Sequence, residues 1–555
     1  MTWLRSPFHR ETLREDAVAG LVLGVESVPD GLAGGLLAAV NPVFGLYGYL
    51  VGTFTGALVT SSSFMAVQAT GAMAIVIADV NEVKHASNPA RALFTLSLVT
   101  GILMILAGLF RLGVLLRFVS NAVIVGFINA VGVNIILGQL SNFTGYKGRG
   151  SNRVVRAVDT LIHPGSLDGR SILIGFATIA LIVLFERTRL GALGLVVAVV
   201  MTSLVVVVLG WDGVVRLSDV AEVPRSLPRP MMPDFKLIVP LTVPALSLAF
   251  VGLVQGAGIS ANFPNPDGTY PKASQDFVGQ GAANVACGFL QGMPVGGSMS
   301  ASSLIKSAGA KSRQALVIAA VVIAIVILLF GSLVSAIALP ALAGLLMLIG
   351  YRTIKPADIQ SVIKTGPVQA TVLAVTFVLT LVIPLQYAVL SGVGLSIMLY
   401  VVRQSNRVEV KQRVYDADGS VRESDPPAVV PAGTVLVLQP YGSLFFASAT
   451  TFESALPSVE ASSSNSVVIL RLRGRSDLGG TFMGVLRRYA QALNGVGSKL
   501  VLVSANDQMI DQLRATRVLD VIGHDDVYPG DEWVGHTVRR ARDDALEWID
   551  GNRSE

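Results

Sequence analysis

Two stretches rich in glycine, serine and threonine interrupt long apolar segments of this sequence. Residues 61–80 begin S-S-S-F-M-A-V-Q-A-T-G-A-M, and residues 291–308 contain M-P-V-G-G-S-M-S-A-S-S. Glycine lets a ligand approach the backbone, and hydroxyl groups donate hydrogen bonds without adding a charge. Half-helices that start inside a membrane direct free N–H groups and a positive dipole end at an anion. The two stretches together predict an anion site, whereas either one alone is also explained by close helix packing.

Three carboxylates accompany the apolar segments. Glu26 and Asp30 are four residues apart in the first of them, so they share one face of a helix. Because a charge at membrane depth is costly, we predict that Asp30, with Glu26 beside it, binds a proton or a cation such as Na⁺. The alternative is that both lie near the membrane surface or a water-filled vestibule. Asp79, beside Asn81 and Glu82, is expected to be an exposed loop residue.

Long uncharged segments must position these residues. Of the 555 residues, 52% are apolar and 14% charged, whereas a soluble domain has about 25% charged residues. Residues 171–185, 193–209 and 315–349 are nearly free of charge and long enough to cross a hydrocarbon layer of about 30 Å once or twice. The chain is therefore predicted to be an integral membrane protein, surrounded by lipid.

Roughly a dozen to fourteen spans fit the membrane part. Basic residues recur in alternate connections, which predicts that these connections, the N-terminus and the C-terminal part are cytoplasmic. One basic loop falls on the predicted outer side instead, where it could attract anions. It contains Lys147, Arg149, Arg153 and Arg156.

Hydropathy and turn residues divide the chain into four parts. These are an N-terminal cytoplasmic segment (1–15), a membrane domain (16–403), a linker with D-G and P-P pairs (404–432), and a soluble domain (433–550). The single cysteine, Cys287, excludes a disulfide within the chain.

Several segments in sequence order resemble the SulP anion permeases, the bacterial relatives of animal sulfate, chloride and bicarbonate carriers. Residues 16–21 (D-A-V-A-G-L) and 28–33 (V-P-D-G-L-A) are similar to the family's D-x-x-A-G-L and I-P-Q-G-M-A, and residues 41–47 (N-P-V-F-G-L-Y) to its P-x-x-G-L-Y. Residues 293–312 look like its F-P-x-x-G-S-F-S-R-T segment and A-G-A-[RK]-[ST] tail. The resemblance covers nearly the whole chain.

This resemblance implies fourteen spans in a seven-plus-seven inverted repeat, with core and gate subdomains, elevator-like alternating access and a homodimer. It implies an anion site between spans three and ten, made of backbone donors and of the Thr70 and Ser300 hydroxyls. The candidate site residues are Thr70, Gly71 and Ala72 at the start of the third helix and Gly297, Ser298, Met299 and Ser300 at the start of the tenth.

The sequence departs from the family at two charged positions. Many members have a carboxylate in the eighth span, in V-G-L-V-E-S, where this chain has Gln255. A neutral amide cannot take up and release a proton near pH 7, so coupling through Gln255 is in doubt. The family's arginine in G-S-F-S-R is Ala301 here, so the balance of charge is kept.

The C-terminal part alternates β-rich runs with amphipathic helices, which predicts an α/β domain. Residues 442–449 and 468–478 resemble a STAS domain (sulfate transporter and anti-sigma factor antagonist). Signalling STAS domains carry a phosphorylated Ser or Thr in a D-x-x-[ST] pattern. Here Asp477 is followed at that position by Gly480, which leaves Thr481 as the only nearby regulatory candidate.

The function expected from these features is secondary active transport of a small inorganic anion, sulfate or bicarbonate first, across the plasma or inner membrane. An uncoupled exchanger, a channel-like protein and a membrane-tethered anion sensor that signals through the STAS domain stay open as alternatives. A nucleobase permease needs acidic side chains that Gln255 and Ser300 do not supply. An enzyme, a metal site, a cofactor other than a coupling Na⁺ or H⁺, and nucleic-acid binding are not expected, because no matching cluster or basic aromatic face is present.

Overall fold

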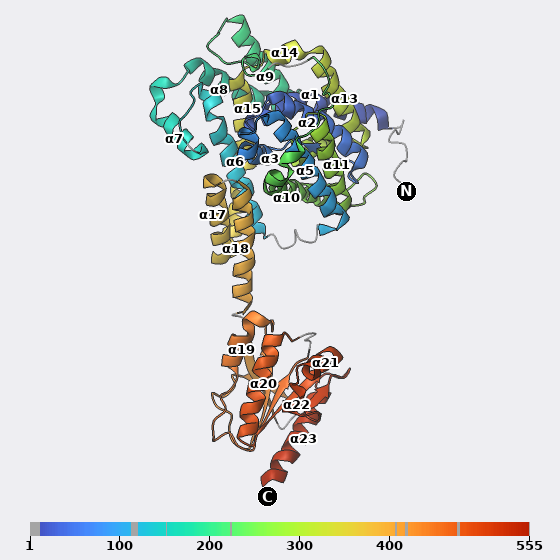
Figure 1. The fold of residues 1–555 in the computed structure, drawn as a ribbon, viewed down its shortest axis with the longest axis vertical. Helices are drawn as coiled ribbons and strands as arrows, with labels where there is room; N and C mark the ends of the chain where they lie inside the picture. The colour runs from blue at the N-terminus through green and yellow to red at the C-terminus, as the bar shows by residue number, and fades with distance from the viewer. Residues whose placement is uncertain are drawn as a thin grey trace. The chain divides into compact units, whose positions relative to one another are not determined.

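The computed structural model describes residues 12–112, 120–150, 152–221, 225–383, 385–405, 408–416, 420–473 and 478–553. The chain forms two compact units, Met1–Ser396 and Ile397–Glu555 (Figure 1). The larger unit is helical and the smaller one is built on a β-sheet.

The larger unit consists of two series of segments in the same order. Each series has two helices, a short strand followed by a short helix, and then four further spans. The first series is α1 (Leu13–Leu37), α2 (Pro42–Val59), β1 (Ala66–Gln68), α3 (Gly71–Ala78), α5 (Pro89–Leu109), α6 (Asn121–Thr144), α8 (Gly169–Glu186) and α9 (Leu193–Val208). The second is α10 (Ile238–Asn262), α11 (Ala273–Phe289), β2 (Gly296–Ser298), α12 (Met299–Ser307), α13 (Gln314–Leu329), α15 (Leu339–Thr353), α17 (Pro367–Val382) and α18 (Leu385–Ser405).

Shorter helices connect these segments. The amphipathic α7 (Arg153–Ile162) and α16 (Pro356–Lys364) follow the fifth span of each series, so the repeat extends to the connections. The others are α4 (Asn81–Lys84), α14 (Gly331–Ser335), and the 3₁₀ turns η3 (Pro164–Ser166), η4 (Leu217–Asp219) and η5 (Phe235–Leu237). The repeated order confirms the predicted seven-plus-seven arrangement.

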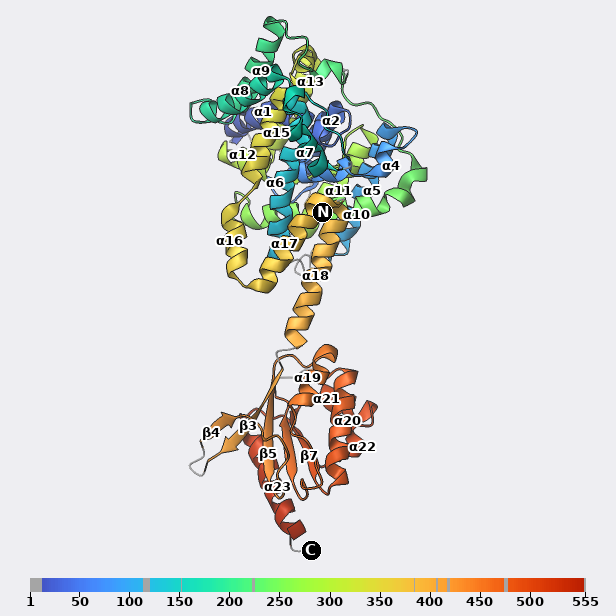
Figure 2. The same cartoon turned by 90° about the vertical axis from the view of Figure 1, so that its left-hand side faces the viewer.

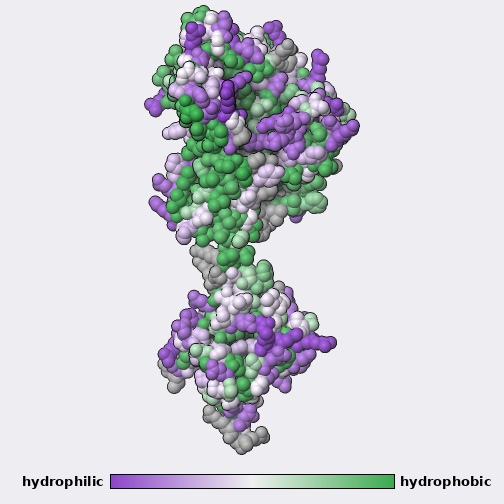
Figure 3. Space-filling view, turned by 60° about the vertical axis from the view of Figure 1, so that its left-hand side comes forward, coloured by the Kyte–Doolittle hydropathy of each residue, from purple (hydrophilic) through white to green (hydrophobic). Residues whose placement is uncertain are grey.

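The composition of the helices suits a bilayer. Six of the described helices are both long and apolar enough to cross a membrane, and four shorter helices are apolar as well. Hydrophobic side chains (green) cover a broad area of the larger unit's surface in Figure 3. Such a surface is stable only in contact with lipid or another apolar partner.

Two packing groups divide the larger unit. The first group joins α1, α2, α5, α10, α11 and α13, and the second joins α6, α8, α9, α15 and α17. Small residues bring helix backbones together within each group. A Cβ added to Gly101 of α5 would lie 2.6 Å from the Gly281 oxygen of α11, and one added to Gly132 of α6 would lie 2.7 Å from the Gly350 oxygen of α15. These groups correspond to the predicted core and gate.

Capping residues set several helix starts. Asn41 accepts a hydrogen bond from the Val43 amide and is followed by Pro42 at the first turn of α2. Asp168 accepts bonds from the first amides of α8 in the same way. Each cap satisfies an amide that has no partner within its helix. α1 begins at Leu13, so the predicted N-terminal segment 1–15 overlaps the first helix; residues 1–11 lie outside the described part.

The smaller unit contains a six-stranded sheet in the order β4-β3-β5-β6-β7-β8, in which β5 to β8 are parallel and β3 is antiparallel to both neighbours. Alternate residues of β5 to β7 face α19 to α22 on one side and α23 on the other (Figure 2). Its elements are β3 (Glu409–Tyr415), β4 (Val421–Ser424), β5 (Val435–Tyr441), η6 (Phe446–Ser448), α19 (Ala449–Ala455), β6 (Val467–Arg471), α20 (Gly480–Gly495), β7 (Lys499–Ala505), α21 (Asp507–Ala515), α22 (Leu519–Ile522), β8 (Val527–Pro529) and α23 (His536–Arg553).

The predicted linker 404–432 has a different structure from the one expected. Its described residues include β3 and β4, and β3 extends the sheet by pairing with β5. The charged residues Lys411 and Arg413 suggest solvated coil, but they alternate with Val410 and Val414 in an edge strand. This segment is therefore part of the α/β unit, and the boundary between the units falls within α18.

Candidate functional site

The two interrupted stretches meet in the interior of the larger unit. β1 pairs antiparallel with β2, with Ala66 opposite Ser298 and Gln68 opposite Gly296. All residues of both strands are buried. Because α3 starts three residues after β1 and α12 starts directly after β2, this pairing brings the two helix N-termini to one place. The predicted meeting of the two stretches is thus present in the structure.

Each half-helix has a hydroxyl cap. The Thr70 Oγ1 accepts a hydrogen bond from the Met73 amide at 3.3 Å, and the Ser298 Oγ accepts one from the Ala301 amide at 3.4 Å. A side-chain cap satisfies one amide of the first turn. The remaining first-turn amides, including those of Ala72 and Ser300, have no partner within their own helix. They are donors of the kind that hold anions at helix N-termini.

Gln255 of α10 contacts the first half-helix directly. Its Oε1 accepts a hydrogen bond of 3.0 Å from the Thr70 Oγ1. The Thr70 hydroxyl therefore donates its one hydrogen to Gln255 and cannot also donate to a ligand in this arrangement. This differs from the expected role of Thr70 in the anion shell, and leaves the Gln255 Nε2 as the neighbouring side-chain donor.

The second half-helix is the more open of the two. Ser300 is exposed and Met299 is 41% exposed, whereas Gly297 and Ser298 are buried. Ser300 Oγ lies 3.2 Å from Ser298 Oγ. At the first half-helix, Thr70 and Gly71 are partly exposed and Ala72 is buried. We call the place where the N-termini of α3 and α12 meet the crossing. A ligand at the crossing would therefore reach solvent along the side that Met299 and Ser300 form.

A polar stripe on α11, missed by the sequence reasoning, bonds β2 and the segments that precede β1 and β2. Asn284 accepts a bond from the Val295 amide at 2.9 Å and donates to its oxygen at 2.6 Å. Gln280 accepts from the Gly297 amide at 2.9 Å, and Asp276 accepts from the Ser61 amide at 2.6 Å. All three side chains are fully buried. Their spacing of four residues in an apolar segment is the signal that could have identified them.

Asp30 is connected to the site through a tyrosine. The Tyr49 hydroxyl lies 2.6 Å from Asp30 Oδ2 and 3.0 Å from the Ala69 oxygen, the residue before Thr70. Both Asp30 and Glu26 are partly exposed, and Glu26 lies one turn earlier on α1. The structure thus places Asp30 next to the chain that leads into the first half-helix.

Asp79 is not the exposed loop residue expected from the sequence. Its carboxylate receives two bonds from Arg153, with Nη1 at 3.0 Å and Nη2 at 2.9 Å, and the Arg153 side chain is 11% exposed. Arg153 also donates to the Ile75 oxygen at 3.2 Å. Arg153 of the basic loop therefore does not face solvent as part of an anion-attracting surface, but joins the start of α7 to the end of α3.

Thr481 is exposed in the first turn of α20. Asp477, which begins the pattern that made Thr481 a regulatory candidate, lies outside the described residues. Cys287 is buried in α11. Among the residues that the structure describes, no group of three His, Cys, Asp or Glu side chains could hold a metal ion.

Comparison with known proteins shows which family this chain resembles. Residues 13–376 match the sulfate permease family, and residues 426–541 match the STAS domain. This chain belongs to the sulfate permease family. The family consists of transporters rather than enzymes.

Curated relatives cover most of the chain at low identity. The chain is 24% identical over 523 residues to a putative sulfate transporter, YvdB, of Bacillus subtilis, which covers 93% of this chain and 96% of that protein. It is also 24% identical over 433 residues to the bicarbonate transporter BicA of Picosynechococcus, with 76% of each chain covered. Murine Solute Carrier 26 family member A9, an anion transporter solved in the inward-facing state, matches with a TM-score of 0.82 and 18% identity over 99% of this chain and 93% of that chain. This last likeness establishes the fold.

Proposed function

We propose that this protein is a secondary active transporter of a small inorganic anion, with sulfate or bicarbonate as the substrate. The observation that supports it most is the β1–β2 pair, which brings the N-termini of α3 and α12 together inside the membrane domain. Two helix ends that face one point supply partial positive charge and free amides without a buried cation. Relatives named as sulfate and bicarbonate transporters favour these two anions.

The anion shell in this proposal consists of backbone and neutral side-chain donors. The first-turn amides of α3, from Gly71 and Ala72, lie on one side, and those of α12, from Met299 and Ser300, on the other. The Ser300 hydroxyl and the Gln255 amide nitrogen complete it. Such a shell can release its ion readily because no full charge pairs with it.

Transport by an elevator-type movement is supported by the two packing groups. The site lies on elements that pack with α1, α10 and α11, whereas α6, α8, α9, α15 and α17 pack mainly with one another. We propose that the first group carries the anion as it slides past the second. A movement of whole groups keeps the β1–β2 pair and its α11 supports intact throughout the cycle.

Coupling to H⁺ or Na⁺ is assigned to Asp30 in this proposal. Its link through Tyr49 to the Ala69 oxygen gives a protonation or cation-binding event a short route to the first half-helix. Gln255 cannot carry the proton in that role, because its amide does not titrate near pH 7. Without coupling at Asp30 the protein would be an uncoupled exchanger.

The remaining features follow the family architecture. We propose a multi-pass protein of the plasma or inner membrane, with cytoplasmic N-terminus and STAS domain, that works as a homodimer. The alternate basic connections of the sequence support this orientation. Thr481 stays a candidate for regulation through the STAS domain.

The test is uptake of labelled sulfate and, separately, labelled bicarbonate into proteoliposomes, with and without inward Na⁺ and H⁺ gradients. Wild type is compared with Asp30→Asn, which keeps the size of the side chain and removes its charge. Gradient-driven uptake that disappears in the variant supports a symporter coupled at Asp30. Anion uptake that is unchanged by the gradients and by the substitution overturns coupling at Asp30. Absence of uptake of both anions overturns sulfate and bicarbonate as substrates.

A further inference from the structure

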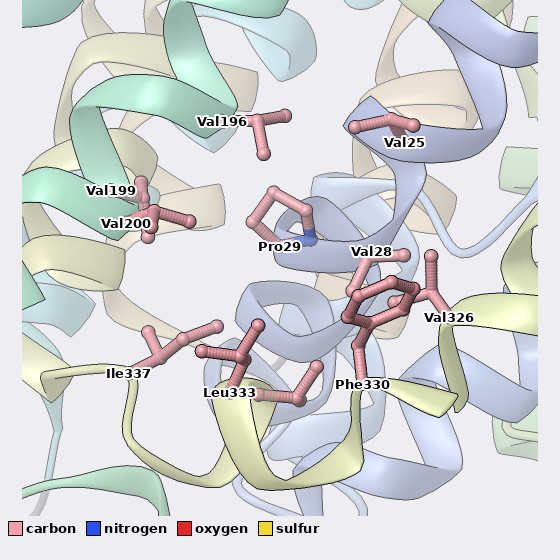
Figure 4. A pocket seen from close by; sticks show the side chains of 11 residues that line it. Val25, Val28, Pro29, Val196, Val199, Val200, Val326, Phe330, Leu333 and Ile337 are labelled. Carbon is pink, nitrogen blue, oxygen red and sulfur yellow. The ribbon is translucent and has the colours of Figure 1, made fainter. Parts of the chain in front are cut away.

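An apolar cavity lies between helices of the two packing groups. It has a volume of about 130 Å³ and is lined by carbon atoms of α1, α9 and the α13–α14 region. Figure 4 shows side chains from these elements converging on one space, among them Val25, Pro29, Val196, Phe330 and Leu333. Nothing in the anion pathway proposed above uses this cavity.

The lining excludes water as an occupant. A buried water needs two to four polar partners, and an engineered apolar cavity of similar size, about 150 Å³, stays dry and binds a benzene-sized molecule. An empty cavity would also forfeit the dispersion contacts of its lining. The cavity therefore suits a hydrocarbon group.

The mouth of the cavity opens onto the apolar outer surface. Phe330 and Leu333 both line it, yet are 46% and 61% exposed. Leu329, which precedes Phe330, and Leu204, one turn after the lining residue Val200 on α9, are exposed by 71% and 57%. In a membrane-spanning protein such a surface faces lipid tails, so the molecule that reaches this mouth is an acyl chain.

A cation lies beside the same mouth. Arg225 is exposed, and its Cγ would lie 3.0 Å from a Cβ built on Gly331, the residue that follows Phe330. Within the described residues no carboxylate comes within ion-pairing distance of Arg225. A guanidinium next to an apolar cavity matches a lipid that carries a phosphate at the head of an acyl chain.

We propose that this cavity is a binding site for one acyl chain of a phospholipid, with the lipid phosphate held by Arg225. The bound chain lies between α1 of the first packing group and α9 of the second. Its wall includes Pro29, which cannot donate a backbone hydrogen bond to Val25 and so leaves that turn of α1 weaker. The lipid chain supports this turn, which is also the turn that leads to Asp30.

The wall of the cavity that contains Ile337 is fixed by backbone pairing. The Leu217 amide donates to the Ile337 oxygen at 2.8 Å, and the Leu339 amide donates to the Val215 oxygen at 2.9 Å. Ile337 lines the cavity. The loop after α9 therefore holds the α14–α15 connection in place, so that the cavity is a formed site rather than a gap between loose segments.

The experiment uses the full-length protein in vesicles of phosphatidylethanolamine and phosphatidylglycerol that contain a phosphatidylglycerol with a photoactivatable acyl chain. Crosslinked peptides are mapped by mass spectrometry. Wild type is compared with Val196→Trp, which fills the cavity, and with the matched control Leu204→Trp on the lipid-facing surface of the same helix. Monodispersity in size-exclusion chromatography shows that each variant is folded.

We expect the label to be concentrated on the peptides that contain Val200 and Leu333. This labelling should be lost in Val196→Trp and kept in Leu204→Trp. Arg225→Gln should reduce labelling by the phospholipid but not by a diacylglycerol with the same acyl chain. Equal labelling of the two tryptophan variants, or label spread evenly over the lipid-facing helices, overturns the acyl-chain site. Insensitivity of phospholipid labelling to Arg225→Gln overturns the phosphate contact. Neither readout depends on anion transport.

Discussion

The two half-helices that meet at the β1–β2 pair differ in their surroundings. α3 is apolar, and Ala72 to Ala78 are all buried. Its start is bonded to Gln255 and its end to Arg153. α12 is polar on one face, with Ser300, Lys306 and other residues exposed. Helices at equivalent positions of the two series thus differ: α3 is buried within the protein, whereas one face of α12 is exposed.

The α11 stripe supports the strand that leads into the open half-helix, and its loss should have the largest effect. Asn284→Leu leaves the Val295 N–H and C=O buried without partners, at a cost of about 1–3 kcal/mol for each group. We expect a clearly lower midpoint of thermal unfolding in detergent and loss of anion uptake. Asn262→Leu is the control, because Asn262 is exposed and bonds only within its own helix. Equal effects of the two substitutions would contradict the role of the stripe.

A fixed negative charge at the open half-helix tests the site itself. Ser300→Asp places a carboxylate among the first-turn amides of α12, where it competes with a bound anion and is itself stabilised by the helix dipole. We expect uptake to be abolished without loss of folded protein. Ser307→Asp, at the other end of the same helix, should transport at close to the wild-type rate. A fully active Ser300→Asp would exclude the crossing as the anion site.

Substitutions in the ion pair at the C-terminal end of α3 test how much this pair stabilises the buried half-helix. Arg153→Gln leaves Asp79 partly buried without its partner, and should cost about 1–3 kcal/mol, less than for a fully buried pair. In a double-mutant cycle with Asp79→Asn, measured by chemical unfolding, the two single costs should not add. Additive costs would show that the two side chains act independently.

The smallest effect is expected at Lys306 on the open half-helix. Its Nζ lies 5.1 Å from the Phe263 ring and 5.8 Å from the Phe64 ring, so these rings hold one positive charge near the C-terminal end of α12. Lys306→Gln should weaken apparent anion affinity about two- to fivefold, equivalent to about 0.5–1 kcal/mol, and less at high salt. Lys311→Gln, also exposed but outside α12, should change affinity less. The opposite order would place the anion route elsewhere.

The sequence predicted the parts of this architecture that depend on composition and local pattern. The charge deficit indicated a membrane domain, and the small-residue stretches around Gly71 and Gly297 indicated broken helices. It could not predict contacts made across the fold. Asp79 has polar neighbours in the chain and therefore looked exposed, because Arg153 reaches it from 74 positions away.

The same limit applies to the role of Thr70. The family resemblance implied that Thr70 contacts the anion, but its hydroxyl donates to Gln255, 185 residues further on. The linker 404–432 shows a different limit. The alternation of apolar and charged residues in its short edge strand is a weak pattern, and the nearby turn residues predicted a linker instead. A pattern within one segment can be recognised in the sequence, whereas hydrogen-bond and ion-pair partners from distant segments are seen only in the structure.

The most direct test of the anion site is the thermal unfolding midpoint of purified protein titrated with sulfate and bicarbonate at constant ionic strength. An anion that binds only the folded protein raises the midpoint with its concentration. We predict such a rise for wild type and Ser307→Asp and none for Ser300→Asp. The same rise in all three proteins would show that the anion binds away from the two half-helices and would contradict the account.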